Sequence, residues 1–273
     1  MPIPPDAFVI IVGAMKAATS TLFYLLSQHP RICPSEIKEP EFFTRHHDGL
    51  SVQSYEEGFA FDCQHHDYCL EASTGYTKFP REIDVPSRMK AYGITPRIIY
   101  VVRDPLERIE SEYNFAHLNN KPWAKPEMLH PDALHKSMYY MQMHQYLQVY
   151  PDKEGYLILD FDDITRRPHE VCDAVFSWLG LSAFEPEDDA RNVTPRRSRV
   201  EQRIRGSSIE WGRYLPIPVR KFVRRFLRRI DSSAKQELSP DEQAKARRWL
   251  QYDIQRFGST FGFPVEKWGF DPC

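Results

Sequence analysis

Several features that would assign this chain to a special class of protein are missing from its sequence. No stretch approaches the roughly 18 consecutive apolar residues of a membrane-spanning helix. The first residues, Met-Pro-Ile-Pro-Pro-Asp, have neither the basic nor the apolar region of a signal peptide. We therefore expect a cytoplasmic protein, or a lumenal one if the chain is an excised domain. Neither internal repeats nor a low-complexity linker interrupts the sequence, and we expect one domain over residues 1–273.

Cysteine is scarce and irregularly spaced. The chain has five cysteines, an odd number that does not indicate a disulfide framework. Cys63 and Cys69 flank two histidines, and both residue types bind zinc, but their separation exceeds the gap of about two to four residues found in structural zinc sites. We therefore expect no metal here, and interpret the segment as a loop that enters a strand at Tyr68–Ala72.

What the sequence does contain is enough apolar material for a large core. Of its 273 residues, 41% are hydrophobic, which excludes disorder throughout. Apolar runs that do not alternate with polar residues predict buried parallel strands at Phe8–Val12, Tyr68–Ala72, Arg97–Val102 and Tyr156–Phe161. Helical patterns lie between and after them, near residues 19–28, 87–92, 105–118, 137–150 and 167–180. This order predicts an α/β fold of three layers, with a mainly parallel sheet and helices on both faces.

A loop of small residues, Gly-Ala-Met-Lys-Ala-Ala, follows the first predicted strand and leads into a helix that begins Thr-Ser-Thr. Main-chain N–H groups and the positive end of a helix dipole meet at such a junction, and Lys16 adds a full charge, so the pattern predicts a phosphate site. The nucleoside-triphosphate loop has a second glycine before its lysine and a hydroxyl after it, whereas Ala17 follows Lys16 here. An ordinary strand-to-helix turn with a chance lysine is the alternative.

A second polar position lies at the end of the strand Arg97–Val102. Asp104 suits a helix N-cap, and Pro105 suits the first helical position, so Arg103 should lie at the carboxyl end of the strand and Ser111 about two turns into the next helix. Ligands of open α/β sheets bind at that edge, so Lys16 and Arg103 are candidates for the same crevice. A solvated charge and a neutral surface residue are the alternatives for Arg103 and Ser111.

The net charge of −2 is unevenly distributed. Residues 191–235 hold 14 Lys and Arg but only 3 Asp and Glu, a charge of +11, so the rest of the chain carries −13. Such asymmetry indicates an anionic partner. Val219–Ile230 is amphipathic, which favours core packing with a solvated basic face, and peripheral membrane contact is the alternative. Ser239 and Glu242 form a capping box for a last helix through Phe257.

Four segments, in this order, resemble the sulfotransferases that use 3′-phosphoadenosine 5′-phosphosulfate (PAPS), in particular the heparan-sulfate branch and its bacterial relatives: GAMKAATSTL, KEPEFF, RIIYVVRDPLERIESEY and YLILDFDDI…FSWLGL. The likeness covers residues 1–185 well and the basic, helical part at 191–273 only loosely. It implies the P-loop-like sulfotransferase fold and transfer of a sulfuryl group from PAPS to a hydroxyl or amine acceptor, such as a saccharide, a lipid or a small molecule.

The resemblance also implies roles for individual residues. The 5′-phosphosulfate end should be bound by Lys16, Ala17, Ala18, Thr19 and Ser20. Arg103 and Ser111 should bind the 3′-phosphate, and Glu39 falls where those enzymes carry the catalytic base, with Phe42 and Phe43 as an apolar wall. Arg196, Arg197 and Arg199 are candidates to replace the late glycine-rich nucleotide loop of the family.

The chain departs from the family pattern at two positions. Glu41 stands where the family often has histidine, and Ala72 stands where it often has a lysine that contacts the sulfate. These departures concern the acceptor more than the donor.

The chemistry fits the residues. Sulfuryl transfer should resemble phosphoryl transfer, so Lys16 at the oxygens of the leaving phosphate would stabilise developing charge and a carboxylate would take the acceptor proton, with no metal required. His46, His47 and His117 are rival bases. A P-loop kinase or NTPase, and a nucleotide-dependent binding module on anionic surfaces, are the alternative functions. We expect no nucleic acid among the partners.

Overall fold

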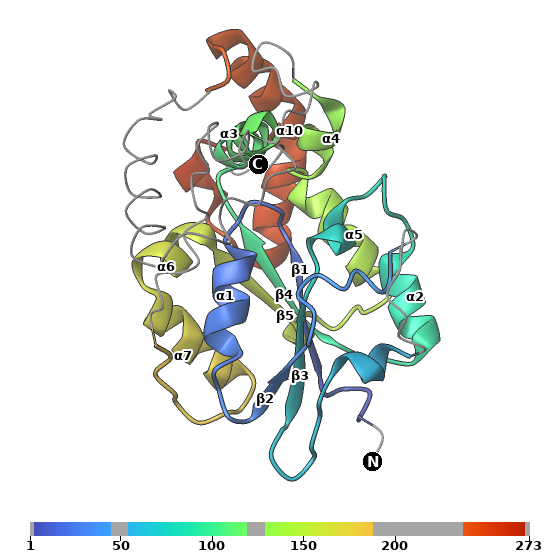
Figure 1. Ribbon diagram of the computed structural model, residues 1–273. Coiled ribbons are helices and arrows are strands. Elements are labelled where there is room, and N and C mark those ends of the chain that lie inside the picture. Colours follow the sequence, from blue (N-terminus) through green and yellow to red (C-terminus); the bar gives the residue numbers. More distant parts are fainter. Residues whose placement is uncertain (1–2, 45–53, 119–128, 188–236, 271–273) are drawn as a thin grey trace, which may run out of the picture.

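The computed structural model describes residues 3–44, 54–118, 129–187 and 237–270 (Figure 1). The strands are β1 (Phe8–Gly13), β2 (Ile32–Pro34), β3 (Tyr68–Ala72), β4 (Arg97–Val102) and β5 (Tyr156–Asp160). The helices are α1 (Thr19–Leu26), α2 (Val85–Tyr92), α3 (Pro105–Leu118), α4 (Pro131–His135), α5 (Tyr139–Leu147), α6 (Phe161–Arg166), α7 (Pro168–Trp178) and α10 (Pro240–Phe261). Short 3-10 helices are η1 (Tyr55–Gly58), η2 (Thr74–Thr77), η3 (Lys153–Gly155) and η6 (Val265–Trp268).

The five strands form a sheet in the order β2-β3-β1-β4-β5, and every neighbouring pair is parallel. β1 lies at the centre, and all of its residues are buried. Burial on both faces explains why its sequence, FVIIVG, is apolar throughout instead of alternating. The chain passes from β1 to β2 and β3 on one side and then crosses to β4 on the other, so the strand order reverses at β1. Such a reversal is where open α/β sheets bind ligands.

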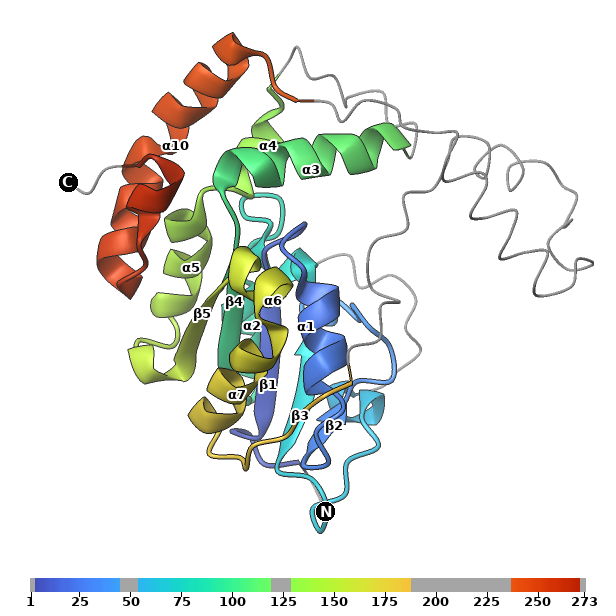
Figure 2. The ribbon, with the colours of Figure 1, turned by 90° about the vertical axis from the view of Figure 1, so that its left-hand side faces the viewer.

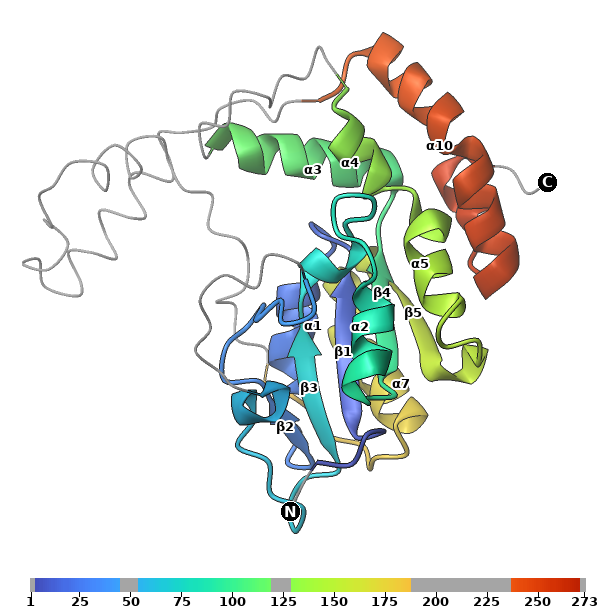
Figure 3. The ribbon, with the colours of Figure 1, turned by 90° about the vertical axis from the view of Figure 1, so that its right-hand side faces the viewer.

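Helices cover both faces of this sheet (Figure 1). Figure 2 shows α1, α6 and α7 on one face, and Figure 3 shows α2 and α5 on the opposite side. The predicted fold class, a three-layer α/β structure with a mainly parallel sheet, is therefore confirmed. Figures 2 and 3 also show α3 lying across the end of the sheet at which β1 and β4 finish, the edge at which the sequence predicts a ligand site.

A few elements differ from the sequence prediction. Ile32–Pro34 form an edge strand, and a run of three residues that ends in proline is too short to predict from its pattern, although a sheet edge tolerates proline. The helix predicted over residues 137–150 is shorter and follows a separate helix, α4. The strand predicted to reach Phe161 ends at Asp160, because the Asp160 carboxylate accepts the Asp162 N–H and begins α6.

The last helix begins where the capping box predicts. The Ser239 hydroxyl accepts the N–H of Glu242 at 3.3 Å, and the helix then continues to Phe261, about one turn beyond the predicted end. α10 packs against α3, α4 and α5. Asp253 fixes one of these contacts, since its carboxylate accepts N–H groups at the start of α5.

Hydrogen bonds to the folded core hold the chain on both sides of residues 188–236. Glu187 donates its N–H to the side-chain oxygen of Gln28 at 2.9 Å, and its carbonyl accepts the Gln28 amide at 3.2 Å. On the other side, the Leu238 N–H donates to the carboxylate of Glu110 on α3 at 3.1 Å. One flanking position is thus bonded to the turn after α1 and the other to α3.

Several predicted residues lie outside the described part of the chain: His46, His47, Arg196, Arg197, Arg199 and the amphipathic stretch Val219–Ile230. Among the residues that the structure describes, no helix combines the length and the apolar character needed to cross a bilayer. The same residues contain no group of three or more His, Cys, Asp or Glu side chains that could hold a metal ion.

Candidate active site

The loop after β1 is shaped by main-chain hydrogen bonds and unusual backbone angles. The Ala14 N–H donates to the Val101 carbonyl of β4 at 2.7 Å, and the Ala17 N–H donates to the Ala14 carbonyl at 3.2 Å. Lys16 and Ala18 have φ angles of 72° and 63°, a region that costs a residue with a side chain roughly 1–2 kcal/mol. Ala18 gives α1 no side-chain cap, so the first N–H groups of α1 suit an anion.

Gly13 lies where η2 packs against the end of β1. A Cβ atom at Gly13 would lie 2.1 Å from the Thr77 hydroxyl oxygen, and the φ angle of +154° is itself unfavourable for other residues. The Thr77 hydroxyl donates to the Val12 carbonyl at 2.8 Å. η2 therefore packs directly on the end of β1, which only glycine permits.

Lys16 lies at the centre of a charged cluster. Its Nζ is 4.2 Å from the centroid of the Phe115 ring on α3. Burial lowers the pKa of Lys16, and the charge of Arg103 lowers it further, whereas Glu112 and Glu39 raise it. Cations that repel one another in a partly buried site favour an anionic ligand, because its charge would relieve both the repulsion and the cost of burial.

The structure places Arg103 beside the same loop. Its Nη1 donates to the Lys16 carbonyl at 3.4 Å, and its Nη2 pairs with Glu107 at 2.9 Å. The guanidinium lies 4.2 Å from the Phe161 ring centroid, and the side chain is only 14% exposed. The Tyr139 hydroxyl donates to the Arg103 carbonyl at 2.6 Å, so the end of β4 is bonded to α5 as well as to the loop after β1.

The start of α3 follows the predicted capping pattern. The Asp104 carboxylate accepts the N–H groups of Leu106 and Glu107 at 2.8 and 3.1 Å. Ser111 lies about two turns along the same helix and is half-buried. Its contact with a phosphate stays a prediction.

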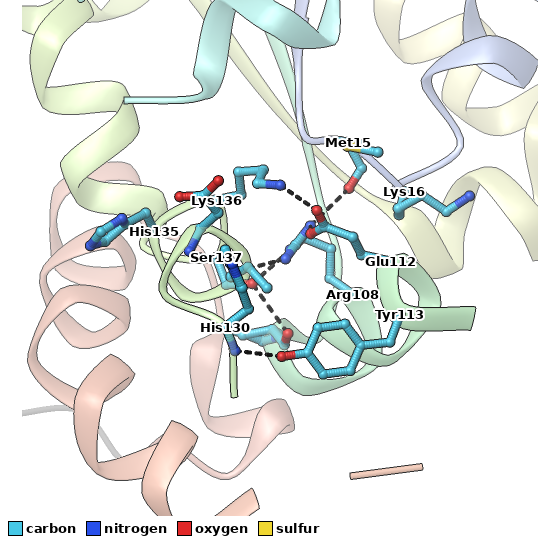
Figure 4. Close-up of polar contacts among 12 residues, drawn as sticks. Met15, Lys16, Arg108, Glu112, Tyr113, His130, His135, Lys136 and Ser137 are labelled. Atoms are coloured by element: carbon cyan, nitrogen blue, oxygen red, sulfur yellow. Dashed lines mark hydrogen bonds and ion pairs between the residues drawn. The ribbon is translucent and has the colours of Figure 1, made fainter. Parts of the chain in front are cut away.

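A buried charge network that no sequence pattern indicates supports the loop from α3 (Figure 4). Arg108 is 0% exposed and donates to the Met15 carbonyl at 3.5 Å and to the Ser137 hydroxyl at 2.6 Å. It also pairs with Glu112 at 2.9 Å, and Glu112 pairs in turn with Lys136. Two cations share one carboxylate, so the network adds net positive charge beneath the loop.

Glu39 lies beside the end of β3, the strand next to β1 in the sheet. Its N–H donates to the Ala72 carbonyl at the end of β3 at 3.0 Å, and its negative charge raises the pKa of Lys16. The predicted water-excluding wall around the carboxylate is only partly formed. Phe43 is buried, but Glu39 is 39% exposed and pairs with Lys38 at 2.7 Å.

The departures from the family pattern change the charges near Glu39. Ala72 is fully buried, so this position brings no cation to the crevice. Glu41 occupies space that a side chain at Gly75 would need, and its carboxylate lies 3.5 Å from the Lys78 Nζ. His117, a rival base, is half-buried on α3.

The fold and these residues define a class of protein: an α/β protein with a P-loop-like fold and a candidate anion site at the carboxyl edge of a parallel sheet. The chain belongs to the sulfotransferase domain family, which it matches over residues 6–258. The family prediction is therefore confirmed.

Two of the relatives that the chain resembles are heparan-sulfate sulfotransferases. It is similar to bifunctional heparan sulfate N-deacetylase/N-sulfotransferase 4 of Mus musculus, with 23% identity over 220 residues, which are 72% of this chain and 25% of that protein. It is also similar to heparan sulfate glucosamine 3-O-sulfotransferase 5 of Homo sapiens, with 25% identity over 188 residues, which are 63% of this chain and 53% of that protein. The chain thus spans about a quarter of the length of the first and about half of the second.

A solved bacterial structure supports the fold. The sulfotransferase from Alicyclobacillus acidocaldarius superimposes with a TM-score of 0.66 and 20% identity, covering 97% of this chain and 98% of that one. The predicted P-loop-like sulfotransferase fold is confirmed by this similarity.

Proposed function

We propose that this protein is a sulfotransferase that moves a sulfuryl group from PAPS to a hydroxyl or an amine. One observation carries the proposal: Lys16, Arg103 and Glu39 meet at one edge of the sheet. The Arg103 Nη1 lies 3.4 Å from the Lys16 carbonyl, and the charge of Glu39 acts on the Lys16 ammonium. Two cations that suit the donor and a carboxylate that suits the acceptor thus lie at the same edge of the sheet.

PAPS is proposed as the donor because the family resemblance assigns two groups of residues to phosphates at two positions of the nucleotide. Lys16 and the residues that start α1, Ala17–Ser20, suit the 5′-phosphosulfate, since N–H groups, a helix dipole and an ammonium converge there. Arg103 and Ser111, beside the loop and along α3, suit the 3′-phosphate. A nucleoside triphosphate carries all its phosphates at one end and would leave the second group unused.

Sulfuryl transfer requires that the donor and the acceptor be positioned and that developing charge be stabilised. As the acceptor oxygen or nitrogen bonds to sulfur, the bond from sulfur to the leaving phosphate oxygen breaks in line. Lys16 and the start of α1 stabilise the charge that develops on the leaving phosphate. Glu39 takes the proton from the acceptor.

The acceptor is proposed from chemistry and similarity. The names of the two relatives describe N-sulfation and 3-O-sulfation of heparan sulfate, an amine and a hydroxyl of a saccharide. We therefore propose saccharide hydroxyls and amines as the first acceptors to test, with lipids and small molecules next.

The decisive experiment compares ligands. Thermal unfolding is measured with adenosine 3′,5′-bisphosphate, with ATP and magnesium, and without ligand. A ligand at 100 times its Kd stabilises by about 2.7 kcal/mol, which should raise Tm by roughly 5–10 °C for a chain of this size. We expect this shift with the bisphosphate. A larger shift with ATP would favour a kinase, and no shift with the bisphosphate would contradict the proposal. Consumption of PAPS with an acceptor separates an enzyme from a nucleotide-dependent binding module.

A further inference from the structure

A buried carboxyl group lies behind the loop that carries Glu39. Glu71 is 0% exposed, although it comes from the central part of an otherwise apolar strand, β3. Hydroxyl groups surround it: Tyr55 and Ser73 donate hydrogen bonds to its two oxygens, and the Tyr76 hydroxyl lies close enough to lower the pKa of the carboxyl. A buried carboxyl persists only with such partners. The proposed reaction gives it no part in binding the donor or in moving the proton.

Two of these hydroxyls also hold the Glu39 loop. The Ser73 oxygen accepts the N–H of Glu41 at 3.0 Å, and the Tyr76 oxygen accepts the N–H of Phe43 at 3.3 Å. Each hydroxyl therefore stands between the Glu71 carboxyl and one main-chain N–H of the loop.

The direction of these bonds depends on the charge of Glu71. A hydroxyl has one hydrogen, and an ionised carboxylate only accepts. When the hydrogens of Ser73 and Tyr76 point to Glu71, their lone pairs face the loop, where the N–H groups of Glu41 and Phe43 donate to them. The carboxylate thus sets both hydroxyls in the orientation that the loop requires.

The loop needs such support because its backbone is strained. Glu39 and Glu41 have φ angles of 60° and 49°, a region that residues other than glycine seldom adopt without support from the surrounding structure. The described contacts that hold it include the bond from the Glu39 N–H to Ala72 and the two bonds through hydroxyls. Without the bonds to the Ser73 and Tyr76 hydroxyls, the loop would relax and the Glu39 carboxylate would move.

We propose that Glu71 is a positioning residue: its carboxylate orients the hydroxyls of Ser73 and Tyr76 and thereby fixes the loop that presents Glu39 to the acceptor. The inference rests on the proposed function of Glu39, but the anchoring itself can be measured without any substrate.

The surroundings of Glu71 are consistent with a charged group near neutral pH. Burial raises the pKa of Glu71 to about 7, while hydrogen bonds from Ser73, Tyr55 and Tyr76 lower it and the charge of Glu41 raises it. Tyr146 on α5 also lies close enough for the Glu71 charge to raise its pKa. Glu71 is therefore largely ionised above about pH 7.

Hydrogen–deuterium exchange of the full chain tests the anchoring. In Glu71→Gln, the amide nitrogen only donates, so it cannot replace a carboxylate oxygen that accepts. We expect the amides of Glu41 and Phe43 to exchange about tenfold faster at pH 8, the change that one lost hydrogen bond produces. Tyr150→Phe is the matched control, because it removes a hydroxyl that bonds to the Ile94 carbonyl instead. Unchanged exchange of the loop in Glu71→Gln would overturn the proposal.

If Glu71→Gln fails to fold, two further variants test the same proposal. Ser73→Ala should expose the amide of Glu41 and spare that of Phe43, and Tyr76→Phe should do the opposite. Equal effects on both amides, or none, would overturn the relay through separate hydroxyls.

A pH profile separates positioning from a general loss of stability. After correction for intrinsic exchange, protection of Glu41 and Phe43 in the wild type should rise as pH increases through about 7, because Glu71 ionises. In Glu71→Gln this rise should be absent. The affinity for adenosine 3′,5′-bisphosphate should stay within about twofold. If the wild type does not bind this nucleotide, the proposed function fails while the exchange result still decides on Glu71.

Discussion

The donor side and the acceptor side of the proposed site are held together by different kinds of contact. On the donor side, β1, its loop and the start of α1 form the site largely from main-chain groups, and Arg103 bonds to a main-chain carbonyl of the loop. On the acceptor side, buried side chains hold a loop with strained backbone at Glu39 and Glu41. A main-chain site depends on a strand-loop-helix pattern that many sequences satisfy, whereas a side-chain site depends on single residues. The departures from the family pattern lie on the second side.

The largest expected effect concerns pH and the acceptor side. Burial raises the pKa of Glu71 from 4.5 to about 7, so the folded protein keeps a proton that the unfolded chain releases between these values. The stabilisation is full below about pH 4.5 and is lost as pH rises to about 7, with an upper limit of about 3 kcal/mol. Urea unfolding between about pH 5 and 8 should show this slope in the wild type and a flatter one in Glu71→Gln. Burial also raises the pKa of Asp253 to about 7, and this contribution is common to both proteins. If the free energy of unfolding changes with pH equally in both proteins, Glu71 is not the group responsible for the slope.

Glu39→Gln should separate the two sides most clearly in an activity assay. The change keeps the shape of the side chain and removes the base, so turnover should fall about 100-fold or more. Calorimetry should show nearly normal affinity for adenosine 3′,5′-bisphosphate, because the donor side is untouched. If most activity remains, Glu39 only pairs with Lys38, and His117 becomes the next base to replace.

Lys16→Ala and Arg103→Ala should damage the donor side instead. Each loses a charge-assisted contact worth about 1.5–3 kcal/mol, so calorimetry should show at least about a tenfold weaker affinity for adenosine 3′,5′-bisphosphate. Arg97→Ala is the control, since Arg97 stacks on Tyr68 and Trp178 at the opposite end of β4. Unchanged affinity in both test variants would remove the proposed donor site.

The smallest expected effect belongs to Ser111. A neutral hydrogen bond contributes about 0.5–1.5 kcal/mol, so Ser111→Ala should weaken binding of adenosine 3′,5′-bisphosphate by roughly twofold to tenfold. Adenosine 5′-monophosphate should bind equally well to the wild type and the variant, because it lacks the 3′-phosphate. Weaker binding of both nucleotides would instead indicate damage to α3, and Ser177→Ala on α7 controls for the substitution itself.

The donor side could be predicted because its signals are local. The apolar run of β1, the small residues after it and the cap at Asp104 each fix a short stretch of backbone, and parallel strands then bring their carboxyl ends together. These rules place Lys16 and Arg103 at one edge without knowledge of any distant contact.

The supporting residues could not be predicted, because their partners lie far away in the sequence. Arg108 and Glu112 form a pair four residues apart, a pattern that is usually exposed on a helix, and only contacts with Ser137 and Lys136 show that it is buried. Glu71 gave a clearer signal, a carboxylate inside the apolar strand YCLEA. Its hydroxyl partner Tyr55, however, comes from a segment whose pattern predicts no element.

The bonds that hold Glu187 and Leu238 have a practical consequence for protein engineering. Gln28 fixes one position and Glu110 fixes the other, so both ends of residues 188–236 are attached to the core by contacts that lie outside that stretch. Exchange of a segment is best tolerated where the flanking backbone keeps its own hydrogen bonds. Chimeras between members of this family should therefore keep Gln28 and Glu110, whose side chains bond to the main chain of Glu187 and Leu238.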